Sequence, residues 1–131
     1  MPKISIEYTK NLLIDEIKKD LVLEIHKIIN KLVSINIENC KTRILQLQDF
    51  YVGNGEDYHA FFHVEIRFLE GRNEQLKNQL GKKILELLKK SLENSLNKLK
   101  VQITVLIEDL PKRYYFKYPM GTFSPLRKDD V

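Results

Sequence analysis

Pro2 is the residue with the clearest chemical potential in this chain. Initiator methionine is normally removed ahead of a small residue, and its removal would leave Pro2 with a free secondary amine. A free α-amino group has a pKa of about 7.7–8.0, and burial or nearby cations lower it. Such a group is suited to act as a general base near neutral pH. Many proteins merely happen to begin with Met-Pro. Here, however, strand-like alternation begins at Lys3, which predicts a terminus anchored in a sheet, whereas most termini fray.

Two histidines and one cysteine are the other candidates for chemistry. His59 and His63 are four residues apart, but on a strand they would lie about 13 Å apart, too far for one metal ion, and Asp57 nearby does not change this. Cys40 is the only cysteine, which excludes an intramolecular disulfide and a Cys-based zinc site, and we expect a buried or linker thiol. His26 is expected at the edge of an apolar helix stripe. Because these histidines are too far apart for one ion, we predict no metal, and because no phosphate-binding glycine loop or dinucleotide fingerprint is present, we expect no nucleotide cofactor.

Length and composition point to one compact domain. The chain has 131 residues, 43% hydrophobic and 31% charged, with 22 basic and 18 acidic side chains giving a net charge of +4. The lysines are spread along the predicted helices, which is typical of solvated surfaces, so no nucleic-acid partner is expected. No apolar run approaches the roughly 20 residues that would cross a bilayer, and no signal sequence is apparent. We therefore predict a cytoplasmic protein without a membrane partner, for which a small anionic substrate remains compatible.

Alternation and helical spacing divide the chain into strands and helices. Ile4, Ile6 and Tyr8 alternate with polar residues, and Asn73 is suited to cap a helix. We expect strands at residues 3–8, 42–52, 60–69 and 101–107, long helices at residues 13–33 and from residue 73 onward, and a short extra strand at 114–118. Pro111 is expected to end the last long strand.

These elements form two β-α-β halves about 58 residues apart, at residues 2–58 and 59–110. Right-handed crossovers predict an α/β (α+β) fold, with a mixed four-stranded sheet and both helices on one face. We expect one domain at 1–117 and a loosely held tail at 118–131. If the uncovered face of the sheet carried Tyr8 and Val64, another subunit would have to bury it, which favours an oligomer.

Short segments along almost the whole chain resemble one enzyme family. They are Met-Pro-Lys-Ile-Ser-Ile-Glu-Tyr-Thr-Lys-Asn-Leu at 1–12, Lys-Thr-Arg at 41–43, Asp-Tyr-His-Ala-Phe-Phe-His-Val at 57–64, Leu-Glu-Gly-Arg at 69–72, Ile-Glu-Asp-Leu at 107–110 and Phe-Lys at 116–117. The ordered set, over residues 2–117, is similar to the 5-carboxymethyl-2-hydroxymuconate Δ-isomerases of the tautomerase superfamily. Two departures are Lys41, where the family has a functional arginine, and Tyr118-Pro119, where it tends to have Asn-Asn.

The resemblance implies a cofactor-free isomerase that moves a proton in a 2-hydroxymuconate-type dicarboxylate, in homoprotocatechuate or related aromatic catabolism. Pro2 would be the catalytic base, and Arg72, with Lys41 or Arg43, would bind the substrate. Arg72 could equally be a solvated turn residue, and Lys41 and Arg43 could lie on an exposed strand face. The family also implies a homotrimer with sites near subunit boundaries. The alternatives are another tautomerase-superfamily activity, such as phenylpyruvate tautomerisation or hydration of an unsaturated acid, and a non-catalytic oligomeric binding protein.

Overall fold

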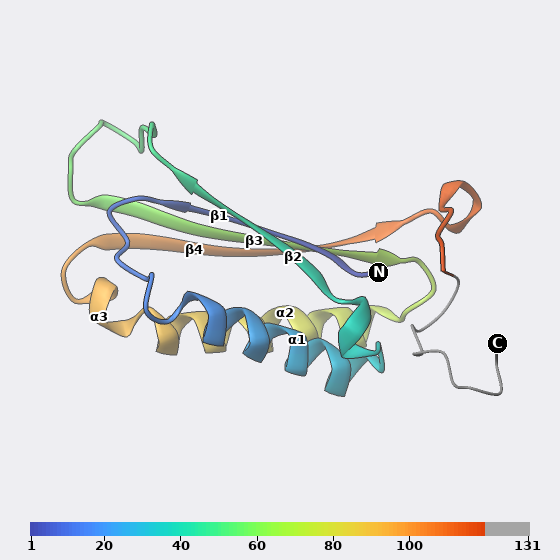
Figure 1. Ribbon diagram of the computed structural model, residues 1–131. Coiled ribbons are helices and arrows are strands. Elements are labelled where there is room, and N and C mark those ends of the chain that lie inside the picture. Colours follow the sequence, from blue (N-terminus) through green and yellow to red (C-terminus); the bar gives the residue numbers. More distant parts are fainter. Residues whose placement is uncertain (120–131) are drawn as a thin grey trace, which may run out of the picture.

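A four-stranded sheet covered on one face by two long helices forms the protein (Figure 1). The computed structural model describes residues 1–119. Its strands are β1 (Lys3–Thr9), β2 (Lys41–Leu47), β3 (His59–Leu69) and β4 (Lys100–Leu110), and its helices are α1 (Lys18–Val33), α2 (Glu74–Ser91) and the short α3 (Glu93–Leu96). Single 3₁₀ turns occur at Ile37–Asn39 and Lys112–Tyr114. No helix of this part of the chain is both long and apolar enough to cross a bilayer.

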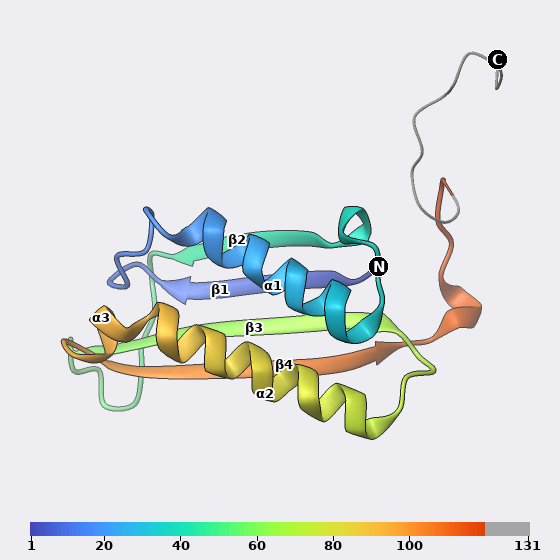
Figure 2. The same cartoon turned by 90° about the horizontal axis from the view of Figure 1, so that it is seen from below.

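The strand order is β2-β1-β3-β4, with α1 crossing between β1 and β2 and α2 between β3 and β4 (Figure 2). Each crossover joins two parallel strands, whereas β1 and β3 are antiparallel neighbours at the centre. The predicted α/β fold, with two β-α-β units and both long helices on one face, is therefore confirmed. Strand β1 begins at the same end of the sheet at which the antiparallel strand β3 ends. The N-terminus therefore lies beside the end of β3 (Figure 2).

The core lies between the helices and the inward face of the sheet. Alternate residues of the two central strands are buried, as period-two patterning predicts: Ile4, Ile6 and Tyr8 of β1, and Ala60, Phe62, Val64, Ile66 and Phe68 of β3. The helices bury residues at three- and four-residue spacing: Leu21, Ile25, Ile29 and Val33 of α1, and Leu80, Ile84 and Leu88 of α2. Asn73 caps α2 as predicted, since its side chain accepts a hydrogen bond from the Leu76 amide at 2.7 Å.

Three element boundaries differ from the sequence prediction. Helix α1 begins at Lys18, not near residue 13. Leu12 and Ile14 belong to the turn before the helix, where their side chains are buried in the core, while Leu13 between them is 90% exposed. Strand β2 ends at Leu47, not at residue 52, because its ladder to β1 ends where β1 ends. Strand β4 is longer than predicted, since it pairs with β3 along its whole length.

The predicted extra strand at 114–118 is wrong. The chain forms a 3₁₀ turn at Lys112–Tyr114 after Pro111 ends β4, and residues 115–119 join no ladder. Most of the predicted tail, residues 120–131, lies outside the described residues.

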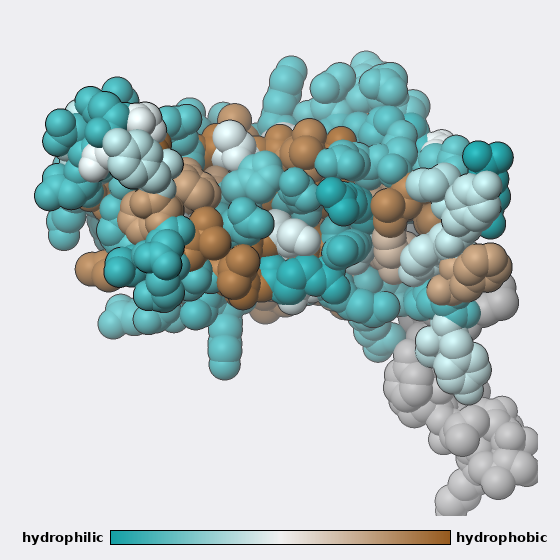
Figure 3. Space-filling view, turned by 90° about the horizontal axis from the view of Figure 1, so that it is seen from above, coloured by the Kyte–Doolittle hydropathy of each residue, from teal (hydrophilic) through white to brown (hydrophobic). Residues whose placement is uncertain are grey.

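Tyr8 and Val64 do not lie on the uncovered face of the sheet. Both are fully buried against the helices, because they share the inward face with the other apolar residues of their strands. The apolar-face argument for an oligomer therefore fails. Figure 3, which views the uncovered face, shows mainly hydrophilic side chains with smaller hydrophobic patches among them.

A polar network covers the middle of that outer face. His63 is hydrogen bonded to Thr104 and, through its other ring nitrogen, to Glu65 at 3.1 Å. Arg67 donates to the second oxygen of Glu65 at 3.1 Å and lies 3.6 Å from a Glu108 oxygen. These side chains come from β3 and β4, so the polar positions that alternate with the core also tie the two strands together.

Candidate active site

Pro2 is buried at the start of β1. Its carbonyl accepts a hydrogen bond from the Lys41 amide at 3.4 Å, so the ladder between β1 and β2 effectively begins at Pro2. Strand β3 flanks β1 on the other side, with Arg67 opposite Lys3. The N-terminus is therefore held in the sheet, as the early onset of alternation predicts. While Met1 is present, the Pro2 nitrogen is an amide.

Two cavities meet at Met1, which lines both of them. The first has a volume of about 330 Å³, and it is mainly polar: Ser34, Asn36, Asn39 and Arg72 line it together with Ile35, Phe68 and Leu69. The second has a volume of about 550 Å³, and apolar and aromatic groups predominate: Asn39, Leu69, Lys112, Tyr115, Phe116 and Lys117 line it. The segment after β4 thus closes one side of the N-terminal region. A molecule bound at the N-terminus could extend into a polar arm, an apolar arm, or both.

The electrostatic environment lowers the pKa of the Met1 amino group below its ordinary value of 8.0. Partial burial is the main cause, because it disfavours the charged ammonium, and the charges of Lys117 and Lys41 add to the effect. Cys40 acts in the opposite sense. The Met1 amine is therefore biased toward the neutral form, which is the form able to accept a proton.

Lys117 is a cation of this region that the patterns in the sequence do not identify as a site residue. Its ammonium donates to the Asn39 side-chain oxygen at 3.0 Å, and both residues line the apolar cavity beside Met1. The only signal was that the Phe116-Lys117 pair belongs to the segments that resemble the family. Spacing in the sequence could not bring Lys117 to Pro2, because the fold alone places these two ends together.

Arg72 lies in the polar cavity and is held there by two contacts. Its guanidinium donates to the Leu69 carbonyl at 2.9 Å and lies 4.9 Å from the centre of the Phe68 ring. The preceding Gly71 has a φ of +121°, a conformation that side-chain-bearing residues rarely adopt, so a glycine is required for this turn. The turn brings Arg72 back toward the N-terminus, where Met1 lines the same cavity.

Lys41 and Arg43 lie at different distances from this site. Both are on the outer face of the edge strand β2, opposite Lys3 and Ser5 of β1. Lys41 is close enough to influence the Met1 amine. Arg43 is not among the residues that line either cavity, and its guanidinium makes a weak 3.5 Å contact to the Lys41 carbonyl. The structure therefore brings Arg72 and Lys41 near the N-terminus, although Lys41, like Arg43, lies on the strand face and lines neither cavity.

The remaining candidates lie apart from the cavities. His59 and His63 are both on β3, as predicted, and among residues 1–119 no three His, Cys, Asp or Glu side chains converge on a possible metal position. His26 is hydrogen bonded to Thr42 at 2.6 Å, and burial lowers its pKa. Cys40 is buried next to the terminus, and burial raises the pKa of its thiol, so it is a poor nucleophile.

Comparison with known proteins gives one family and one fold. The family described as 5-carboxymethyl-2-hydroxymuconate isomerase matches residues 2–119, whereas no curated protein sequence matches. A 5-carboxymethyl-2-hydroxymuconate isomerase from Deinococcus radiodurans R1 has a TM-score of 0.81 at 19% identity, over 88% of this chain and 87% of that chain.

Two further solved structures are also similar. A macrophage migration inhibitory factor-like protein from Entamoeba histolytica has a TM-score of 0.63 at 18% identity, over 93% of this chain and 98% of that chain. A fused 4-OT protein described as a symmetric trimer has a TM-score of 0.72 at 14% identity, over 89% of this chain and 92% of that chain. At these identities the structures show the fold and not the substrate.

Proposed function

Because this chain belongs to the 5-carboxymethyl-2-hydroxymuconate isomerase family, we propose that it transfers a proton within a small unsaturated 2-oxo acid, with the Pro2 nitrogen as the base. Family and fold support an isomerase or tautomerase. The observation that carries the finer proposal is the position of the terminus, which is anchored in the sheet, meets two cavities and holds the Met1 amine in surroundings that lower its pKa.

Removal of Met1 is the first requirement of this mechanism. It converts the Pro2 amide into a secondary amine and vacates a place that lines both cavities. The neutral nitrogen then takes a proton from the enol hydroxyl or from the carbon next to the 2-oxo group, and the double bond shifts. The same nitrogen returns that proton to another carbon, so the step is an isomerisation without net oxidation or hydrolysis.

Cationic side chains have two roles in the proposal. Arg72 in the polar cavity binds a substrate carboxylate, because a planar guanidinium can donate two parallel hydrogen bonds. Lys117 and Lys41, which add to the lowering of the pKa of the Met1 amine by burial, would favour the neutral form of the Pro2 amine in the same way and stabilise the negative charge that develops on the 2-oxo group. Arg43, which lies two residues further along the same face of β2, is the alternative to Lys41 in binding.

The proposed substrate is a 2-hydroxymuconate-type dicarboxylate of aromatic catabolism, and the proposed assembly is a homotrimer. The family name supports this substrate class, and two similar proteins are described as symmetric trimers. A phenylpyruvate-type or unsaturated-acid activity on the same site is the alternative that the apolar cavity favours, because Tyr115 and Phe116 line it. A panel of enols and unsaturated acids would separate these substrates.

Substitution of Pro2 tests the proposal. We expect Pro2→Ala to lower turnover of a 2-hydroxymuconate by at least about 10²-fold, the scale of a general base, with an unchanged circular dichroism spectrum. The mass of each protein must show that Met1 is absent. Undiminished turnover by Pro2→Ala would contradict the proposal, and retention of Met1 in the native protein would favour a binding role instead.

A further inference from the structure

Asn39 is the polar side chain that the two cavities at the N-terminus share. Met1, Leu69 and Asn39 line both cavities, and the other lining residues belong to one cavity only. In the proposed function Met1 is removed, so the space that it leaves next to Pro2 joins the polar and the apolar cavity. Of the described residues, Asn39 then provides the hydrogen-bonding side chain common to both.

The backbone around Asn39 fixes its position. The Asn39 amide donates to the Asn36 carbonyl at 2.9 Å, so Asn39 ends a hydrogen-bonded 3₁₀ turn. The Asn36 side chain caps that turn by accepting from the Glu38 amide at 2.9 Å. Two residues after Asn39, the Lys41 amide donates to the Pro2 carbonyl. Asn39 is therefore tied through the backbone to the residue that pairs with Pro2.

The side-chain amide of Asn39 has a fixed orientation. The Lys117 ammonium donates to it at 3.0 Å, and an ammonium only donates, so the acceptor is the amide oxygen. The amide nitrogen lies on the other side of the planar group and is turned away from Lys117. It has no hydrogen-bond acceptor among the described residues, and the side chain is half-buried. The cation also polarises the amide, which strengthens the nitrogen as a donor.

We propose that the Asn39 amide nitrogen donates a hydrogen bond to the 2-oxo oxygen of the substrate. This inference rests on the proposed function, because the place of that oxygen opens only when Met1 leaves. The adjoining carboxylate then lies in the polar cavity with Arg72, and the remainder of the substrate extends into the apolar cavity. The bound acid thus has one orientation, with its reacting carbon next to Pro2.

The hydrogen bond stabilises the charge that the proton transfer creates. When the carbon next to the 2-oxo group gives its proton to the Pro2 nitrogen, the electron pair of the broken C–H bond forms a C=C bond. The π pair of the carbonyl group moves to the oxygen, which becomes negative, and a fixed donor binds this enolate more strongly than the neutral ketone. Return of the proton to another carbon restores the neutral oxygen. Asn39 therefore contributes to turnover as well as to orientation.

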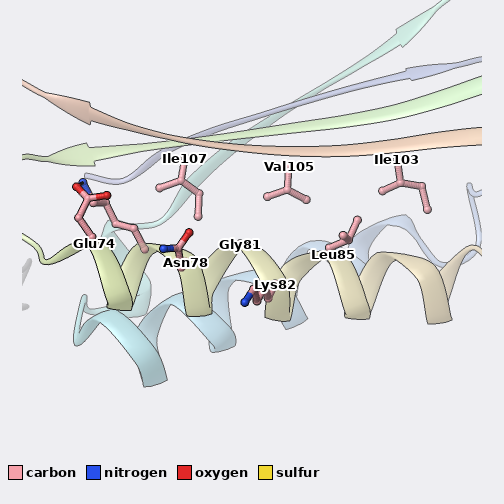
Figure 4. Close-up of a pocket in the computed structure, with 9 residues that line it drawn as sticks. Glu74, Asn78, Gly81, Lys82, Leu85, Ile103, Val105 and Ile107 are labelled. Atoms are coloured by element: carbon pink, nitrogen blue, oxygen red, sulfur yellow. Dashed lines mark ion pairs between the residues drawn. The ribbon is translucent and has the colours of Figure 1, made fainter.

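A hollow between α2 and β4 must be distinguished from this site in binding experiments. Its volume is about 410 Å³, and Val105 and Ile107 point into it from β4 (Figure 4). Of the two lysines that line it, Lys77 is already paired with acidic side chains at 3.0 and 3.3 Å, whereas Lys82 is exposed. An acid bound in this hollow would therefore depend on Lys82 and not on Asn39.

Binding of 2-oxoadipate and adipate tests the hydrogen bond directly, because the two dicarboxylates differ only at the 2-oxo group. Neither contains a C=C bond to isomerise. By calorimetry on the full-length processed protein in its native assembly, we expect 2-oxoadipate to bind more tightly than adipate. Asn39→Asp should reduce this preference at least about threefold, the scale of one neutral hydrogen bond. Its carboxylate still accepts from Lys117 but does not donate.

Asn36→Asp is the matched control. It makes the same change from amide to carboxylate in the polar cavity and keeps an acceptor for the Glu38 amide, so the preference should remain. Asn39→Ala, which adds no charge, should lose the preference like Asn39→Asp, and Lys82→Gln should keep it. The proposal is overturned by a wild-type protein without the preference, by an unchanged preference in either Asn39 variant, or by an equal loss in Asn36→Asp or Lys82→Gln.

Kinetics separate this role from an anchoring of Lys117 alone. A donor to the 2-oxo oxygen predicts that Asn39→Ala lowers kcat at least about tenfold at pH values where the Pro2 amine is neutral. If Asn39 only held Lys117, its loss would move the acid limb of kcat/KM and leave that plateau unchanged, which would contradict the proposal.

These outcomes are distinguishable from failure of the proposed function. If Pro2→Ala turned over normally while the preference for 2-oxoadipate still depended on Asn39, the proposed base would be wrong and the hydrogen bond would stand. If Pro2→Ala lost turnover while the preference did not depend on Asn39, only the hydrogen bond would be rejected.

Discussion

The Lys117 ammonium donates a hydrogen bond to the Asn39 side-chain oxygen over 3.0 Å, beside the first residue of the chain. The two residues are 78 positions apart. Asn39 ends the 3₁₀ turn before β2, and it lines both cavities at Met1. This contact fixes a positive charge next to the terminal amine, so the segment after β4 influences the chemistry of the first strand.

Replacement of Lys117 should change the pH profile of the proposed reaction. Lys117 lowers the pKa of the Met1 amine, and we expect it to act in the same sense on the Pro2 amine that remains after Met1 is removed, so Lys117→Gln should raise the pKa of the Pro2 amine. The acid limb of kcat/KM should therefore move to higher pH. Lys112→Gln is the matched control, since Lys112 lines the same cavity but does not contribute to the shift of the Met1 amine. An unmoved limb in Lys117→Gln, or an equal movement in both variants, would contradict this electrostatic role.

Arg72 should affect substrate binding more than turnover. We expect Arg72→Gln to raise KM by roughly tenfold or more, because hydrogen bonds to charged groups contribute about 1.5–3 kcal/mol. Arg72→Lys should recover only part of this loss, since lysine keeps the charge but not the fork. The guanidinium also contacts Leu69 and Phe68, so steady-state kinetics must be accompanied by an unfolding curve.

Comparison of Arg43→Gln with Arg72→Gln shows which of the two cations binds the substrate carboxylate. Arg43 lies on the strand face outside both cavities, so its replacement should change KM less than Arg72→Gln does. The comparison requires protein concentrations at which the assembly of both variants has been verified. If Arg43→Gln had the larger effect on KM, the assignment of the carboxylate to the polar cavity would be wrong.

His26 should make the protein less stable in acid. Burial lowers its pKa in the folded state from 6.5, so the unfolded chain binds the proton first as the pH falls. Stability is therefore lost below about pH 6.5 and until the lowered folded-state pKa is reached. His26→Gln can keep a hydrogen bond to Thr42 without titrating. Urea unfolding at pH 8 and pH 5 should show a smaller acid loss for this variant, and an unchanged loss would exclude His26 as its source.

The fold was largely predictable because its central strands are buried on one face only. Alternation in β1 and β3 therefore identifies both the strands and their inward residues. The start of α1 was not predictable in the same way, since Leu12 and Ile14 continue the apolar spacing while their backbone forms a turn. The end of β2 depends on where β1 ends, which is a property of pairing and not of the β2 sequence.

The candidate site was predictable only in part. The type of residue and its place at the terminus drew attention to Pro2, and the resemblance drew attention to Arg72 and Lys41. Lys117 was missed because its relation to the terminus arises from long-range packing after β4. Whether Tyr8 and Val64 lie on the uncovered face was left as a condition, and the structure places both on the buried face with the other apolar residues of their strands.

The most direct test of the central claim compares turnover by the same chain with and without Met1. Both forms share every side chain of the cavities except that of Met1 itself, and only the processed form has a basic nitrogen at Pro2. Mass-verified processed protein should convert a 2-hydroxymuconate to its 2-oxo isomer at least about 10²-fold faster than protein that retains Met1. Equal rates for the two forms would show that the Pro2 nitrogen does not carry the proton.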